Sequence, residues 1–465
     1  MKKAFSIILL SAFILAIFTS CNSNSGAQLL SFISSDADVI DLNRKTVTIS
    51  SESDIQTALF EQKENTAMYD AILKRLSDIE KFYNCKIAHV EHEGTPTVIQ
   101  NLMSLAATGD SEIDIIYGHG HNKIGKLAYA DILYPLTDVQ DYIDYTNSEK
   151  FGSAGLLEAA MINGIPYAVQ PVQWVGFANS FAFHIVWNTE KFAQFGLPNL
   201  HEYYENKTWT FENFEKLFET YSGMKNEDVD LIAFQKGYFG LTSLYANGVK
   251  MCDYNGTDFY CDIADDKALY AADWALNLFN KYDSIIHKVS TWETDDFVSE
   301  TVLMQTVQVA AATLTLPYEA EFQFSLMPFP SGPNANYGEW ANLVEALRGF
   351  AISKFSDIPD AAARIINDLC EPFEDVTPTG LFDYYNEQVF YNQIDVEILL
   401  DVGKYTRNFY SVDNETLWSF KDQFNDNQTA SQIINAYKDK IEILVEEYIR
   451  PNFEGYVYEH LYEDN

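Results

Sequence analysis

The order of strand and helix patterns in residues 47–117 constrains the fold more than any other feature of this sequence. Apolar and polar residues alternate where strands are expected, and apolar residues recur at helical spacing between them. The expected elements are strands at 47–50, 86–90 and 113–117 and helices at 66–83 and 98–107. This order of strand, helix, strand, helix and strand predicts a parallel sheet covered by helices on both faces.

The same alternation continues through the middle and the end of the chain. Strands are expected at 181–187 and 349–353, and further helices at 265–282, at 359–369 and within the last 40 residues. Thr210 precedes a helical pattern in which Phe214 and Phe218 share one face, and a threonine in that position caps a helix. The sequence contains no internal repeat and no low-complexity linker, which predicts two α/β halves joined by more than one crossing segment.

The N-terminus has the layout of a secretory signal. Lys2 and Lys3 precede an apolar run over residues 4–18, and small residues lead to Cys21. The segment resembles a bacterial lipobox, although Phe18 occupies a position where an aliphatic residue is usual. The resemblance implies cleavage after Ser20 and a lipid anchor on the sulfur of Cys21. The alternative is an uncleaved transmembrane anchor, for which the apolar run is short.

Composition narrows the class of partner. The chain has 465 residues, of which 47% are hydrophobic, and no second apolar run reaches membrane-spanning length. Its formal net charge is −38, and removal of Lys2 and Lys3 with the signal gives −40, because residues 1–20 contain no acid. Such a surface repels phosphate backbones, which excludes nucleic acid as a partner.

Four cysteines remain after Cys21. Cys252 and Cys261 flank an Asn-Gly pair that is typical of a type I′ hairpin turn. A disulfide between these two residues is one alternative in an extracytoplasmic chain, and two free thiols are the other. The sequence contains no CxxC motif and therefore does not indicate a zinc ribbon or a redox site.

An ordered series of motifs resembles the family 1 extracellular solute-binding proteins. The motifs lie at residues 114–136, 163–169, 188–198, 209–214, 324–333, 349–353 and 359–363, and the resemblance covers most of residues 45–450. Two departures are Asp131, where glycine is usual, and residues 299–304, which replace a Gly-Lys-Ala-Ala-Met stretch.

The resemblance implies a two-lobed α/β fold of the periplasmic-binding-protein type, with mostly parallel sheets and a ligand cleft between the lobes. The expected divisions are a signal (1–20), a tether (21–43), lobe 1 (44–172), lobe 2 (173–325), a return to lobe 1 (326–375) and a C-terminal helical segment on lobe 2 (376–465). The implied function is capture of a sugar or oligosaccharide by a lipid-anchored, monomeric receptor. That receptor would deliver the sugar to the permease subunits of an ABC importer, without catalysis and without a cofactor.

Candidate ligand-binding residues are polar or aromatic side chains in loops that follow strands or lie near the crossing segments. Such residues supply stacking planes and planar hydrogen bonds for sugars. The candidates are Glu52, Asp54, His119, His121, Asn122, Gln170, Gln173, Trp174, Trp292, Tyr318, Glu319, Trp340, Glu345 and Arg348. Each has a structural alternative, because an aromatic ring can belong to the core and an acid to a solvated face.

Other functions are weighed against this one. His89 and His92 with Glu91 and Glu93, and His119 with His121, invite a metal-binding interpretation, but no ligand set stands at a fixed spacing. The GxSxG, HExxH and phosphate-loop motifs are absent. A surface glycosidase or lyase, and a receptor for peptides or another nutrient, remain as alternatives; Arg348 can clamp a ligand carboxylate or pair with a surface acid.

Overall fold

The computed structural model describes much of the chain after residue 39. The described residues are 40–51, 67–91, 104, 113–119, 124, 127–128, 130–151, 157, 161–162, 164–171, 182–224, 229–251, 253–254, 259–291, 293–309, 311–341, 348–373, 385–386, 389–403, 415–425 and 428–452. The predicted signal sequence and Cys21 lie outside them. No helix within the described part of the chain is long and apolar enough to span a membrane.

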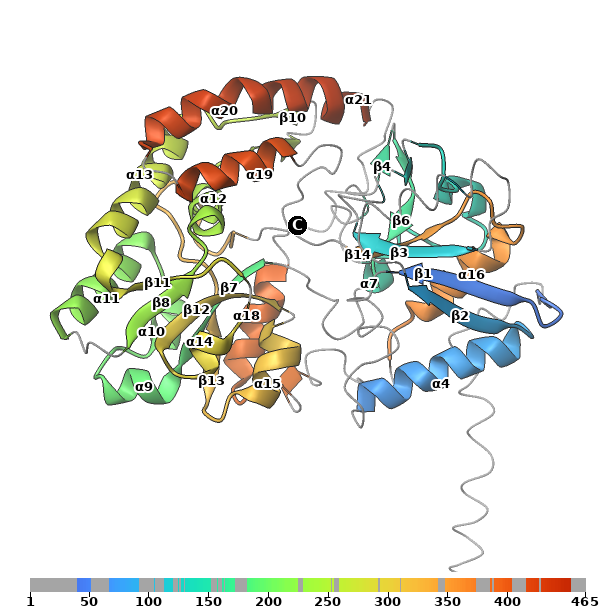
Figure 1. Cartoon of the computed structure of the whole chain (residues 1–465), viewed down its shortest axis with the longest axis horizontal. Coiled ribbons are helices and arrows are strands. Elements are labelled where there is room, and N and C mark those ends of the chain that lie inside the picture. The colour runs from blue at the N-terminus through green and yellow to red at the C-terminus, as the bar shows by residue number, and fades with distance from the viewer. Residues whose placement is uncertain are drawn as a thin grey trace, which may run out of the picture.

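Two five-stranded sheets organise these residues into two lobes, as Figure 1 shows. The lobe 1 sheet has the order β2-β1-β3-β14-β6, and the lobe 2 sheet has the order β11-β8-β12-β7-β13. The lobe 1 strands are β1 (Thr46–Ser51), β2 (Lys86–Glu91), β3 (Ile115–His119), β6 (Ala168–Val169) and β14 (Arg348–Ile352). The lobe 2 strands are β7 (Ala182–Asn188), β8 (Asp230–Phe234), β11 (Ile286–Lys288), β12 (Val302–Gln308) and β13 (Phe324–Met327). The predicted two-lobed α/β fold class is confirmed.

Each sheet combines parallel and antiparallel pairs. In lobe 1, β1 pairs in parallel with β2 and β3, whereas β14 runs antiparallel to β3 and β6. In lobe 2, β8 pairs in parallel with β11 and β12, whereas β7 runs antiparallel to β12 and β13. The sheets are therefore less uniformly parallel than expected. The cause is that β7 and β14 enter their sheets from the other lobe rather than through a crossover helix of the same lobe.

In lobe 1 the helix predicted at 66–83 is confirmed, whereas the helix predicted at 98–107 lies outside the described residues apart from Ser104. The helices of lobe 1 are α4 (Ala67–Phe82), α7 (Ser148–Phe151) and α16 (Pro359–Leu369), with the 3-10 turn η2 (Leu136–Val139). Helix α4 packs against β2 and α16, and α16 packs against β14. Val47 and Ile49 of β1 are fully buried, as expected for a strand in a sheet that is covered on both faces.

Asp114 fixes the start of β3 in lobe 1. Its Oδ2 atom accepts a hydrogen bond from the backbone N–H of Thr48 (3.0 Å), and its Oδ1 atom accepts one from the hydroxyl of Ser356 (2.6 Å). The carboxyl group is 5% exposed, and these donors compensate for its removal from water. Asp114 thereby joins β1, β3 and the segment after β14.

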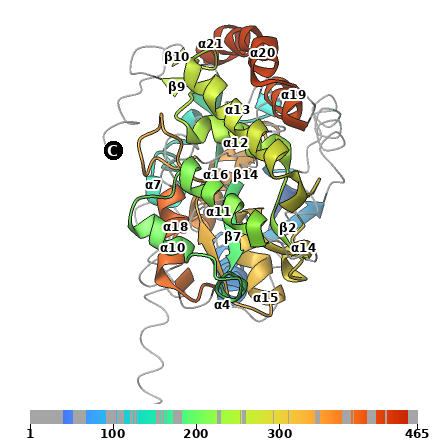
Figure 2. The same cartoon turned by 90° about the vertical axis from the view of Figure 1, so that its left-hand side faces the viewer.

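Lobe 2 surrounds its sheet with a larger set of helices. They are α9 (Thr189–Gln194), α10 (Leu200–Glu205), α11 (Phe211–Met224), α12 (Lys236–Ala246), α13 (Asp266–Lys281), α14 (Asp295–Val298) and α15 (Leu316–Glu319), with the 3-10 turn η3 (Asp283–Ile285) and the π-helix η4 (Ala311–Thr315). Figure 2 faces this lobe, with α11, α12 and α13 in front of the sheet. Stacked aromatic rings, such as Phe211 on Trp274 at 3.7 Å, fill the space between them.

The predicted helix start at Thr210 is confirmed. The Thr210 hydroxyl accepts a hydrogen bond from the backbone N–H of Asn213 (3.4 Å). Trp209 is fully buried beside this cap and donates its indole N–H to the carbonyl of Pro328 (2.8 Å). The cap and the tryptophan together attach the start of α11 to the segment that follows β13.

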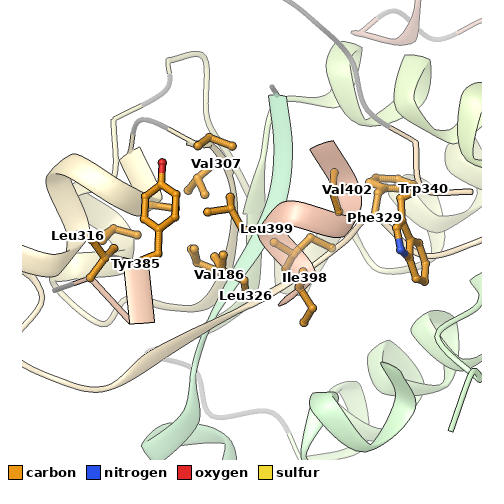
Figure 3. Close-up of a cluster of buried hydrophobic side chains, with 14 of the residues drawn as sticks. Val186, Val307, Leu316, Leu326, Phe329, Trp340, Tyr385, Ile398, Leu399 and Val402 are labelled. Atoms are coloured by element: carbon orange, nitrogen blue, oxygen red, sulfur yellow. The ribbon is translucent and has the colours of Figure 1, made fainter. Parts of the chain in front are cut away.

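The C-terminal helices pack on lobe 2. They are α18 (Gln393–Gly403), α19 (Glu415–Asp422), α20 (Ala430–Leu444) and α21 (Arg450–Asn452), with the 3-10 turn η5 (Gln423–Asn425) and the π-helix η6 (Val445–Ile449). Helix α18 contacts β13, α19 contacts α12, and α20 contacts α13. Figure 3 shows Ile398, Leu399 and Val402 of α18 within the buried cluster that contains Val186 and Leu326.

The return from lobe 2 to lobe 1 occurs later in the chain than expected. The predicted boundary at residue 326 falls inside β13, and Trp340 still packs on Tyr204 of α10. The chain rejoins lobe 1 at β14. The exact divisions of the chain into lobes otherwise stay predictions.

Two positions at which the sequence departs from the family pattern have left-handed backbones. The φ angle is 58° at Asp131 and 60° at Glu300, and this region is disfavoured for residues with a Cβ atom. Glu300 lies in the segment that departs from the family pattern, and β12 begins two residues later. The altered sequence therefore keeps the turn that a glycine would ease and still forms a central strand.

The hairpin predicted around residues 252–261 is present. Strands β9 (Asp253–Tyr254) and β10 (Phe259–Tyr260) pair antiparallel. Cys261 is a free, partly buried thiol, and burial raises its pKa to about 11. Cys252 lies outside the described residues, so the disulfide between the two cysteines stays a prediction.

Candidate functional site

Three of the predicted ligand-binding residues lie at one edge of the lobe 1 sheet. His119 ends β3 and is paired in register with Arg348, which begins β14. Gln170 directly follows β6, the neighbour of β14 on its other side. Because β14 is antiparallel to both neighbours, its amino end lies beside their carboxyl ends. The fold thus brings together residues from three distant parts of the sequence.

This edge lies where the chain passes between the lobes. The chain continues from Gln170 toward β7 of lobe 2, and it comes back from lobe 2 to begin β14 at Arg348. Ligands of open α/β sheets bind outside the carboxyl ends of the parallel strands. The edge that carries His119, Gln170 and Arg348 is therefore the candidate site of lobe 1.

Gly349 lets the strands approach one another at this edge. A Cβ atom at residue 349 would lie 2.8 Å from the carbonyl oxygen of Val169, which is closer than real Cβ contacts. Beside it, the rings of Tyr117 and Phe350 pack at 4.5 Å across β3 and β14. A glycine and a buried aromatic pair therefore hold β6, β14 and β3 in register beneath the candidate residues.

A further polar contact at the same edge escaped the sequence analysis. Ser51 ends β1, and its hydroxyl oxygen lies 2.5 Å from the Nε2 atom of His89 on β2. Ser51 is only 2% exposed. The signal available in the sequence was a polar residue at the carboxyl end of a strand, but serine is too common there to be singled out.

The chemistry of this edge suits a polar ligand. Histidine and glutamine side chains each supply hydrogen-bond donors and acceptors, whereas arginine supplies a planar set of five donors and a positive charge. Gln170 is 4% exposed. Groups of this kind can bind the hydroxyls of a sugar, and arginine can also bind a carboxylate.

Two predicted residues lie on lobe 2 beyond the carboxyl end of β12. Tyr318 and Glu319 belong to α15, which follows the π-helix η4. Both are exposed, and the fractional exposure of Tyr318 is 48%. The described contacts do not place them beside His119, Gln170 or Arg348.

Trp340 has a packing role in lobe 2. Its ring is 3% exposed, stacks on Tyr204 at 5.8 Å, and donates its indole N–H to Asp401 Oδ2 (2.8 Å). The Tyr204 hydroxyl donates to the same oxygen (3.3 Å), and burial together with the Asp401 charge raises the pKa of Tyr204. Trp340 thereby ties the returning chain to α10 and α18. Figure 3 shows it at one end of the buried cluster.

The other candidates lie outside the described residues, and their roles stay predictions. They are Glu52, Asp54, His121, Asn122, Gln173, Trp174, Trp292 and Glu345. The metal-binding interpretation rested partly on such residues, because His92 and Glu93 are also outside. Within the described part of the chain, no three histidine, cysteine, aspartate or glutamate residues form a group that could hold a metal ion.

Comparison with known families gives one match over most of the chain. Residues 74–374 match the family described as bacterial extracellular solute-binding protein. A search of curated proteins found no match.

Solved structures with the same fold include three whose proteins are described in complex with a ligand. Maltose-bound MalE3 of T. maritima has a TM-score of 0.60 and 15% sequence identity, with 86% of this chain and 100% of that chain covered. The GacH receptor of Streptomyces glaucescens, described in complex with acarbose, has a TM-score of 0.61 and 13% identity, with 87% and 99% covered. UgpB of Mycobacterium tuberculosis in complex with glycerophosphocholine has a TM-score of 0.60 and 13% identity, with 86% and 98% covered. These similarities establish the two-lobed fold.

Proposed function

Because the chain belongs to the family of bacterial extracellular solute-binding proteins, we propose that it is the receptor of an ABC importer and captures a sugar or oligosaccharide between its lobes. The observation that carries this proposal is the meeting of His119, Gln170 and Arg348 at one sheet edge, at the passage between the lobes. Sugar-bound proteins of the same fold, which include MalE3 and GacH, support the choice of ligand class.

The proposed mechanism is binding without chemical change. A ligand that contacts both lobes stabilises the arrangement in which both sets of contacts are made, and so shifts the equilibrium toward it. Gln170, His119 and Arg348 would supply the lobe 1 contacts. Tyr318 and Glu319 are the described candidates for lobe 2. The closed, loaded protein would then be recognised by the permease subunits.

The proposal includes attachment to the membrane through Cys21. The small residues before Cys21 and the short apolar run support cleavage after Ser20 and lipidation of the new N-terminal cysteine. The expected result is that the wild-type protein partitions with membranes and incorporates labelled fatty acid. Cys21→Ala should abolish both. Labelling of the Cys21→Ala protein to the wild-type level would overturn this part of the proposal.

A thermal-shift screen of residues 22–465 tests the ligand class. A ligand at about 100 times its Kd adds about 2.7 kcal/mol to the free energy of unfolding and raises the Tm. We expect a shift with one class of oligosaccharide. A shift with peptides and none with sugars would transfer the proposal to the peptide alternative. Recovery of the bound sugar unchanged argues for a receptor, whereas recovery of shorter products identifies a glycosidase or a lyase.

A substitution of Arg348 tests the site, and a substitution of Lys354, a second cationic residue close to β14, serves as its control. Arg348→Gln should weaken or abolish the shift produced by the ligand. Lys354 lies just beyond the other end of β14, where it pairs with Asp131. Lys354→Gln should leave the ligand response unchanged. Equal responses of the two variants would show that the ligand does not use this edge.

A further inference from the structure

A small hairpin of lobe 1 reaches into the hydrophobic core of lobe 2. It consists of β4 (Met161–Ile162) and β5 (Ile165–Pro166), with Met161 paired to Pro166 and Ile162 to Ile165. Figure 1 shows β4 on the side of lobe 1 that lies near the C-terminal helices.

The β5 end of the hairpin is fixed in lobe 1. Ala168 and Val169 of β6 follow within four residues of Ile165 and pair with β14 of the lobe 1 sheet. Tyr167, which lies between β5 and β6, packs against a cluster of lobe 1 residues that includes Leu133 and Ala351. Strand β5 also contacts η2 of the same lobe. The hairpin must therefore move with lobe 1.

The side chain of Met161 belongs instead to a core of lobe 2. It is 2% exposed and lies in a hydrophobic cluster whose other described buried members all come from residues 238–272 and 420–445. Those members include Tyr238 of α12, Phe424 of η5 and Leu444 of α20. An unbranched, polarisable methionine side chain fills an irregular gap of this kind well.

We propose that Met161 is a contact between the lobes that stabilises the lobe arrangement of this structure and separates when the lobes move. Since the hairpin is fixed to lobe 1 and the surrounding core to lobe 2, a change in the angle between the lobes must withdraw Met161 from that core. Its apolar surface would then meet water, which opposes the movement. The contact thus contributes to the equilibrium between lobe arrangements, in which the ligand also participates.

The wild-type protein allows a direct test through methionine oxidation. Met251 is a matched control, because it is 1% exposed and lies in the same cluster but comes from lobe 2 itself. Dilute hydrogen peroxide converts an exposed methionine to its sulfoxide. We expect Met161 to be oxidised faster than Met251 by about tenfold, the ratio for an opening that costs 1.4 kcal/mol less. Equal rates for the two residues would overturn the proposal.

Variants give an independent readout without a ligand, so this test does not depend on the proposed sugar. Fluorophores carried by unnatural amino acids at Lys81 of α4 and Glu212 of α11, whose side chains are 75% and 77% exposed, report the distance between the lobes. Met161→Ala should shift the distribution of that distance. Met251→Ala, which removes the same side chain from within lobe 2, should leave it unchanged. An unaltered distribution in folded Met161→Ala protein would contradict the proposal.

Discussion

The Nε2 atom of His201 lies 3.0 Å from the Oδ1 atom of Asp395, and this contact joins α10 to the first turn of α18. The same oxygen accepts a hydrogen bond from the backbone N–H of Leu326 (2.7 Å), on the edge strand β13. Asp395 is fully buried. One carboxyl group therefore connects the C-terminal segment to a helix of lobe 2 and covers a donor that an edge strand would otherwise leave open.

Loss of this carboxyl group should destabilise lobe 2. Asp395→Ala would leave the Leu326 N–H and the His201 ring without their partner in a buried site, and we expect it to lower the free energy of unfolding by about 3–5 kcal/mol. Asp395→Asn keeps an acceptor for Leu326 and should cost less. Urea denaturation followed by circular dichroism measures both. A loss below about 1 kcal/mol in Asp395→Ala would contradict this account.

His184 should make the protein sensitive to acid. Its ring is fully buried on β7, no residue in the described part of the chain forms a hydrogen bond with it, and burial lowers its pKa to about 4. The unfolded chain takes up a proton near its ordinary pKa of about 6.5, whereas the folded chain does not until about pH 4. Stability is therefore lost as the pH falls through this window, by about 2 kcal/mol between pH 7 and pH 4.5. Urea midpoints at the two pH values should differ less in His184→Leu than in the wild type.

In contrast to His184, Asp368 should make the protein more stable as the pH falls. Burial raises its pKa to about 6, and it accepts a hydrogen bond from the Tyr83 hydroxyl (2.5 Å). Between about pH 6 and pH 3.8 the folded chain binds a proton at Asp368 that the unfolded chain does not bind. The free energy of unfolding therefore rises by about 1 kcal/mol as the pH falls from 7 to 5. Asp368→Asn should abolish that gain. Thermal melts of the wild type and Asp368→Asn at pH 7 and pH 5 measure this effect. An equal change in Tm in the two proteins would contradict a raised pKa at Asp368.

The left-handed backbone at Glu300 predicts a difference between two small substitutions. Glu300→Ala and Glu300→Gly both remove the ion pair with Lys191, but only alanine keeps a Cβ atom at a φ of 60°. Glu300→Gly should therefore be more stable than Glu300→Ala by about 1 kcal/mol. Differential scanning calorimetry measures the difference. A more stable alanine variant would show that the turn is not strained.

Periodicity and capping chemistry made most of the elements predictable from sequence. The strands at residues 47–50 and 113–117 and the helix capped by Thr210 were found because their signals are local. The direction of β14 was not, since it depends on the lobe from which the chain arrives. Left-handed Glu300 was hidden as well, because glutamate gives no sign of such a backbone.

The residues of the candidate site also differ in whether a local sequence signal could identify their role. His119, Gln170 and Arg348 could be proposed because each adjoins a strand, although only the β14 register places them at the same end of the sheet. Trp340 was chosen for its ring and its place near a crossing. Its partners, Tyr204 and Asp401, are distant in sequence, and no local pattern announces a contact between them.

The place of β14 between β3 and β6 has a consequence for how the chain folds after synthesis. Among the described strands, β6 pairs with β14 alone, so lobe 1 cannot complete that sheet until residue 352 has been made and exported. The five described strands of the lobe 2 sheet have all been made by residue 327. We expect nascent chains that end at residue 341 to contain a protease-sensitive lobe 1, and longer chains to protect it. The sheet that is encoded first is thus the sheet that is completed last, although the C-terminal helices are added to lobe 2 later still.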